Sequence, residues 1–120
     1  MSAAVIGFAQ DVAVFPQLGH SRAVKSVAFS SDMKYLVSTD KNTIKLWDVA
    51  TKREIRSLTG HLNEVKSIAF SPDGKQVLSG SSDNTVKLWD AASGQVICTI
   101  ELKWGVDSVI FSPDGKQILY

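Results

Sequence analysis

Residues 84–90 of the chain read NTVKLWD, and residues 42–48 read NTIKLWD, so this segment returns after 42 positions. A second segment returns after 41 positions each time: VKSVAFS at 24–30, VKSIAFS at 65–71 and VDSVIFS at 106–112. A fixed period of this length is the signature of a repeat architecture, in which each unit packs against its neighbours. The 120 residues therefore hold two full units and the first half of a third.

The apolar residues inside each unit alternate with polar ones, as at Ile44 and Leu46, and β-branched residues are frequent. Alternation with period two predicts β-strands, and no segment has the pattern of a helix. We expect four short strands in the first unit, four in the second, two that open the third, and one unattached strand before the first. The first unit has strands at 24–30, 35–38, 43–48 and 53–58, and the second has them at 65–71, 76–80, 85–90 and 95–100. The third opens with strands at 106–112 and 117–120, and the unattached strand is 12–18.

Tight turns join the predicted strands. The sequence SPDGK at 71–75 and 112–116 combines a proline that presets φ, an aspartate that bonds its own backbone, and a glycine that accepts positive φ. The first unit has Met33 at the glycine position. Because a left-handed residue other than glycine costs about 1–2 kcal/mol, we expect this turn to be looser or differently shaped.

Composition and charge exclude several classes of protein. The chain is 44% hydrophobic and 21% charged, as in one small globular domain, and its 13 basic and 12 acidic residues leave no basic stripe for nucleic acid or an anionic membrane. The lone Cys98 cannot form an intrachain disulfide, and His20 and His61 have no metal-ligand spacing. No apolar run approaches the ~20 residues of a membrane span. We therefore expect no metal, no cofactor, no nucleic-acid partner and no integral membrane segment.

Residues 1–11 form an N-terminal segment separate from the repeats at 12–120. The apolar residues 3–9, followed by Gln10 and Asp11, resemble the end of a secretory signal peptide that lacks its basic start. The alternative is an unpaired apolar N-terminus. The expected compartment is cytoplasmic, or the protein is exported if residues 1–9 are the end of a signal peptide.

The recurring motifs resemble those of the tryptophan–aspartate (WD) repeat family. They are the Gly-His pairs at 19–20 and 60–61, the Trp-Asp pairs at 47–48 and 89–90, and the stretch SGSSDN at 79–84. The resemblance covers residues 12–120 and implies an all-β fold of four-stranded antiparallel blades, two complete and part of a third, as in a partial β-propeller. The blades would span about 20–58, 61–100 and 102–120.

The resemblance also implies a hydrogen-bonded tetrad of His, Ser or Thr, Asp and Trp in each blade. By position, its members are His61, Ser79, Asp83 and Trp89 in the second unit and His20, Ser38 and Trp47 in the first. The first unit is one residue shorter and has Lys41 where Asp83 lies relative to its tryptophan, with Asp40 as the carboxylate nearby. The third unit has Glu101-Leu102 or Leu102-Lys103 in place of Gly-His.

Ser79, His61 and Asp83 are also the residue types of a nucleophile triad, but no nucleophile-elbow or oxyanion-hole motif accompanies them. The resemblance implies instead a non-catalytic scaffold on which other proteins or peptides dock. Trp104 is either an exposed contact residue or a core-edge one. The loops that would carry partner contacts contain Arg22, Lys41, Asn63, Glu64, Ser82 and Trp104.

Two and a half blades leave two apolar faces open, because repeat units need several neighbours. The leading expectation is therefore the N-terminal fragment of a longer propeller protein. One alternative is a self-completing homo-oligomer, in which strand 12–18 of one copy joins the third blade of another. Another, implied by the resemblance, is the regulatory propeller part of an effector such as a caspase-like peptidase, and no residues of such an effector are seen in the 120.

Overall fold

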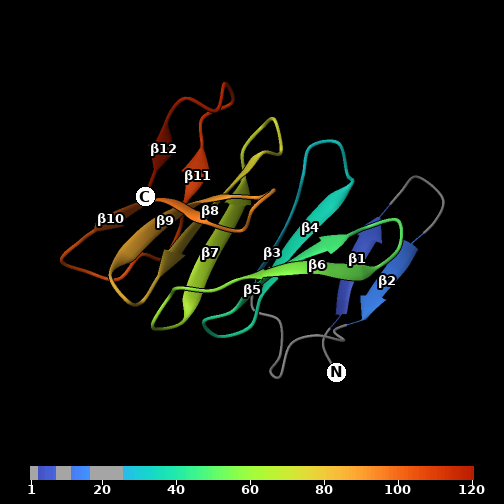
Figure 1. Ribbon diagram of the computed structural model, residues 1–120, viewed down its shortest axis with the longest axis horizontal. Coiled ribbons are helices and arrows are strands. Elements are labelled where there is room, and N and C mark those ends of the chain that lie inside the picture. Colours follow the sequence, from blue (N-terminus) through green and yellow to red (C-terminus); the bar gives the residue numbers. More distant parts are fainter. Residues whose placement is uncertain (1–2, 8–11, 17–25) are drawn as a thin grey trace.

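The computed structural model describes residues 3–7, 12–16 and 26–120, and this part of the chain contains strands and no helix. Two four-stranded antiparallel sheets form the centre of the molecule, and each is a simple meander (Figure 1). Blade 1 consists of β3 (Ser26–Phe29), β4 (Tyr35–Thr39), β5 (Ile44–Asp48) and β6 (Arg53–Leu58). Blade 2 consists of β7 (Val65–Phe70), β8 (Gln76–Ser81), β9 (Thr85–Asp90) and β10 (Val96–Glu101). The predicted all-β, four-stranded blades are confirmed.

The two ends of the chain form smaller sheets. In the third unit, β11 (Ile110–Phe111) pairs with β12 (Ile118–Leu119), so both strands are shorter than predicted. At the other end, β1 (Ala3–Gly7) and β2 (Val12–Pro16) form an antiparallel hairpin. The expectation that strand 12–18 is unattached is wrong, because the apolar segment before it supplies a partner for its backbone hydrogen bonds.

The turn of blade 1 keeps the shape of its counterpart in blade 2. Met33 has a φ of 62°, close to the 73° of Gly74. Asp32 Oδ1 accepts hydrogen bonds from the serine hydroxyl and the lysine N–H of its own turn at 2.6 and 2.9 Å, and Asp73 does the same at the same distances. The expectation of a looser turn is wrong, since these hydrogen bonds hold the backbone while Met33 adopts the left-handed conformation.

The apolar core lies between the units. Val37, Ile44, Leu46 and Leu58 of blade 1 pack with Val65, Ile68, Val77, Trp89 and Ala91 of blade 2 in one buried cluster. A second cluster joins blade 2 to the third unit. The approach there is close: a Cβ added to Gly80 would lie 2.6 Å from Val106 and 2.9 Å from Val109. Val106 and Val109 are thus packed in the core although they are not in a strand.

The strand ends define two opposite faces. The loop face consists of residues 40–43, 59–64, 82–84 and 102–109, which join consecutive strands at one end of the blades. The turn face consists of residues 30–34, 49–52, 71–75, 91–95 and 112–117 at the other end. Three of its turns, 30–34, 71–75 and 112–117, lie side by side at the top of Figure 1. Neighbouring turns touch, since the Ser31 hydroxyl donates to Pro72 O at 2.7 Å.

Candidate functional site

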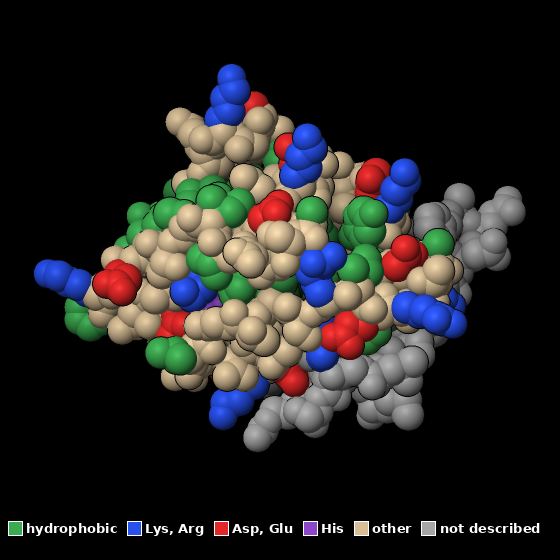
Figure 2. All heavy atoms as spheres, viewed as in Figure 1, with side chains coloured by type: hydrophobic (Ala, Val, Ile, Leu, Met, Phe, Trp, Pro, Cys, Tyr) green, Lys and Arg blue, Asp and Glu red, His purple; other side chains and the backbone are tan. Residues whose placement is uncertain are grey.

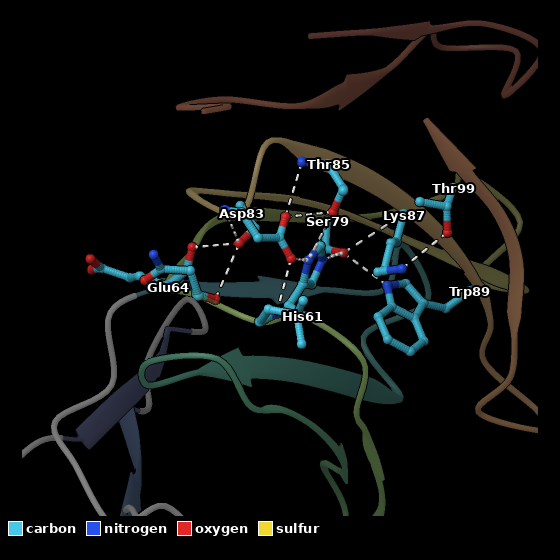
Figure 3. Close-up of polar contacts among 11 residues, drawn as sticks. His61, Glu64, Ser79, Asp83, Thr85, Lys87, Trp89 and Thr99 are labelled. Carbon is cyan, nitrogen blue, oxygen red and sulfur yellow. Dashed lines mark hydrogen bonds and ion pairs between the residues drawn. The ribbon is translucent and has the colours of Figure 1, made fainter. Parts of the chain in front are cut away.

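A chain of polar side chains crosses blade 2 from its core to the loop face (Figure 3). Trp89 Nε1 on β9 donates to the Ser79 hydroxyl on β8 at 2.8 Å. His61 Nε2 lies 2.6 Å from the same hydroxyl, and His61 Nδ1 lies 2.8 Å from Asp83 Oδ2. The structure therefore places all four residues of the second unit's predicted tetrad in one hydrogen-bonded series.

The hydrogen-bond partners along the series indicate an arrangement of its protons. Because the Ser79 oxygen accepts from Trp89, its own proton is available for His61 Nε2. Nδ1 of a neutral His61 then carries the ring proton and donates to Asp83. Every buried polar atom along this line has a partner, which is the condition for burying polar groups at low cost.

Two pKa values follow from this environment. Burial lowers the pKa of His61 below its usual value and outweighs the opposing effect of the Asp83 carboxylate. Burial alone would raise the pKa of Asp83, but hydrogen bonds from the Thr85 hydroxyl, the Leu62 N–H and His61 outweigh it and lower that pKa to about 2. Near neutral pH the pair is a neutral imidazole beside a carboxylate. Thr85 and Leu62 were not predicted as members of this site. Thr85 lies in the repeated segment 84–90 but was not assigned to the tetrad, and Leu62 takes part only through its backbone N–H.

The same geometry argues against nucleophilic chemistry at Ser79. Its side chain is wholly buried at the centre of β8, and the Trp89 indole occupies one side of the hydroxyl. A nucleophile must approach the reacting atom of a substrate, and no substrate can reach Ser79 without unpacking the blade. His61, Ser79 and Asp83 instead link β8 to the loops beside it through hydrogen bonds.

Blade 1 has part of the same arrangement. Trp47 Nε1 donates to the Ser38 hydroxyl at 2.9 Å, and both side chains are buried. Asp40 is also buried, and its Oδ1 accepts a hydrogen bond from the Lys41 N–H. His20, the remaining predicted member, lies outside the described residues.

The predicted partner-binding residues gather on the loop face. Lys41, Asn63, Glu64, Ser82 and Trp104 occupy four successive loops that contact one another, and Arg22 lies outside the described residues. Val65 N donates to Lys41 O at 2.6 Å, Ser82 N to Glu64 O at 2.9 Å, and Val106 N to Ser81 O at 3.0 Å. Backbone hydrogen bonds thus join the loops of neighbouring units into one surface.

Two large apolar side chains project from this surface. Trp104 is 80% exposed and Leu62 is 88% exposed. Of the two alternatives for Trp104, an exposed residue or one at the edge of the core, the structure has the exposed one. Leu62 lies in a loop that the sequence predicted to carry contacts, but it was not singled out as a contact residue. The one available signal was its place directly after the Gly-His pair, at the start of a loop already expected to carry contacts.

The described part of the chain lacks a cluster of metal-binding side chains. It contains no group of three or more His, Cys, Asp or Glu side chains that could hold a metal ion. Over the same ranges, no helix is long and apolar enough to cross a membrane.

Comparison with known proteins gives a family model and two curated relatives. The model described as "WD domain, G-beta repeat" matches residues 10–48 and 52–90. Serine-threonine kinase receptor-associated protein of Mus musculus is 42% identical over 40 residues, and the protein of that name from Gallus gallus is 40% identical over 40 residues. Each match covers 33% of this chain and spans 11% of the relative's length.

Proposed function

The chain belongs to the WD-repeat family, and from that premise we propose that it is a non-catalytic scaffold that binds other proteins through its loop face. The carrying observation is that Leu62 and Trp104 are largely exposed on two loops of this face, 59–64 and 102–109. Large apolar side chains held in water favour a binding partner that removes them from it. Tryptophan is also among the residue types that contribute most at protein interfaces.

The polar residues around this pair suit the rim of an interface. Asn63 Oδ1 accepts from Glu64 N–H at 2.8 Å, and Lys66 lies 3.4 Å from the Glu64 carboxylate. The Ser81 hydroxyl donates to Glu64 O at 2.9 Å and so ties the loop to β8. Loops fixed in this way lose little conformational entropy on binding, which favours affinity.

A peptide-display selection against the 120-residue chain tests this proposal. We expect most selected peptides to bind the double variant L62S/W104S at least about tenfold more weakly, because it removes both apolar anchors. The matched control is M33Q, which replaces an exposed apolar side chain on the opposite, turn face. Peptides that bind L62S/W104S and M33Q with equal affinity would contradict the proposal.

We also propose that further propeller blades cover the open side of blade 2 and the third unit. Exposed apolar side chains gather there, on β10, β11 and the end of the chain, and they are Val96, Ile97, Ile110, Leu119 and Tyr120. Figure 2 shows apolar side chains gathered on the side of the molecule where β8–β10 lie in Figure 1. The covering blades come from the same polypeptide in a longer protein or from a second copy of the chain.

A further inference from the structure

A groove of about 370 Å³ lies between the two complete blades, beside the turn face. Tyr35, Leu46, Ile55 and Arg56 of blade 1 form one wall, and Phe70 and the segment 90–92 of blade 2 form much of the other. Tyr35 and Ile55 are 37% and 39% exposed, so apolar surface inside the groove is open to water. The groove is separate from the loop face, because the turns that border it are at the opposite ends of the strands.

A β-bulge in β6 aims two neighbouring side chains into this groove. Leu46 pairs with Arg56 and Trp47 pairs with Glu54, so Ile55 is the extra residue. Adjacent residues of a regular strand point to opposite faces, whereas a bulge re-aims a side chain. Ile55 and Arg56 consequently both line the groove.

Arg56 is held in place without its hydrogen bonds being satisfied. A Cβ added to Gly94 would lie 3.1 Å from Arg56 Cδ, so the β9–β10 turn covers the arginine stem. Its Nε is buried and has no hydrogen-bond partner among the described residues. Since buried donors in proteins are almost always paired, the unpaired Nε shows that the Arg56 guanidinium keeps unused hydrogen-bonding capacity beside the groove.

The charges around the groove favour a carboxylate as an acceptor for this guanidinium. Lys75 contributes a second positive charge to the lining. Asp90 is the acidic member of the lining, and its Oδ2 is already engaged by the hydroxyl and N–H of Ser93 at 2.7 and 3.3 Å. The guanidinium of arginine presents its donors in a fork that matches a carboxylate.

We propose that this groove binds a linear segment of a partner protein in which an apolar side chain stands next to an acidic one. The apolar side chain packs against Tyr35, Ile55 and Phe70, while the carboxylate accepts hydrogen bonds from Arg56. This site goes beyond the proposed loop-face function and does not depend on it. The two faces are able to hold two segments of one partner or two partners at once.

The test uses the fluorescein-labelled peptide GSELDSG and fluorescence anisotropy with the 120-residue chain. We expect saturable binding that weakens at least about tenfold for R56M, which keeps the length of the side chain but removes the fork. The matched control R53M removes an exposed arginine of β6 that does not line the groove, and it should bind within about twofold of the unaltered chain. All peptides carry a C-terminal amide, so GSQLNSG lacks every carboxylate of the peptide and GSESDSG lacks the apolar side chain. Both should bind at least about tenfold more weakly.

A second measurement needs no variant of the protein. A GSELDSG derivative that carries benzophenone at its apolar position should crosslink to Tyr35, Ile55 or Phe70, as mapped by mass spectrometry. The L62S/W104S variant should bind GSELDSG unchanged, so failure of the loop-face proposal is distinguishable from failure of this one. The absence of saturable binding, equal affinity for GSELDSG and GSQLNSG, or crosslinks on the loop face would overturn the groove assignment.

Discussion

At the scale of single residues, Asp83 organises the polar chain of blade 2. Its Oδ1 accepts from the hydroxyl and N–H of Thr85 at 2.5 and 2.9 Å, and its Oδ2 accepts from Leu62 N–H at 3.0 Å as well as facing His61. These bonds link the β8–β9 loop to the loop before β7. The motif spacing predicted His61, Ser79, Asp83 and Trp89, but the Leu62 N–H is a backbone donor that no side-chain pattern marks.

The pH dependence of stability should report on His61. Its pKa is lower in the folded protein than in the unfolded chain, so the unfolded chain takes up a proton first as the pH falls. We expect the free energy of unfolding to be level above pH 7 and to decrease as the pH falls below about 6.5, with a slope of at most about 1.4 kcal/mol per pH unit for this one proton. Urea unfolding followed by circular dichroism at a series of pH values measures this.

Two comparisons isolate the contribution of His61. The H20Q variant should retain the decrease between pH 7 and 5.5, whereas H61Q should lose it while being less stable throughout. A further decrease between about pH 4 and pH 2 belongs to the carboxyl groups whose pKa is lowered in the folded protein, Asp83 among them. A stability that stays constant from pH 8 to 5.5 would show that His61 is not buried in its neutral form.

At the scale of elements, alternation and turn chemistry predicted the eight strands of the two blades to within a few residues. The features that were predicted wrongly or not at all depend on interactions that the local sequence pattern does not show. Met33 adopts a conformation it disfavours because Asp32 fixes the turn. The bulge at Ile55 interrupts a strand whose sequence has no glycine or proline to mark it. Val106 and Val109 pack against Gly80, but residues 106–109 do not form the strand expected of them.

The turn at Met33 allows a test of how the backbone strain of a left-handed methionine affects stability. Glycine removes the left-handed strain of about 1–2 kcal/mol but makes the unfolded chain more flexible. We expect M33G to raise the free energy of unfolding by about 0.5–1 kcal/mol in urea denaturation. The reverse change in the second unit, G74M, should lower it by about 1–2 kcal/mol. If M33G destabilises the protein, Met33 contributes packing that outweighs its strain.

At the scale of the whole molecule, stability comes from the contacts between units. The largest buried cluster joins blade 1 to blade 2, and the next joins blade 2 to the third unit. Such an arrangement behaves as a one-dimensional stack, in which each unit is stabilised by its neighbours. The repeat period predicted this organisation, but the sequence does not state what lies against the open side of blade 2.

Light scattering after size-exclusion chromatography tests the proposal that further blades cover the open side of blade 2 and the third unit. We expect the mass of the 120-residue chain to exceed 13.0 kDa and to rise with concentration, because exposed apolar side chains on β10–β12 favour association. The L119S/Y120S variant should shift towards 13.0 kDa. A discrete β-rich oligomer would assign the covering blades to a second copy, and a polydisperse species would assign them to a longer polypeptide. A folded monomer at every concentration would contradict the proposal that further blades cover this side, whether they come from a second copy or from a longer polypeptide.

The bulge of β6 has a counterpart in β10, where Ile97 is the extra residue between Val96 and Cys98. The two bulges lie 42 positions apart, and Cys98 occupies the place that Arg56 has in blade 1. The two units thus share the backbone feature and differ in the side chain that follows it. Under the proposed groove binding, a junction formed on β10 would offer a thiol where the junction on β6 offers a guanidinium, so the position after the bulge would set the ligand preference of each junction.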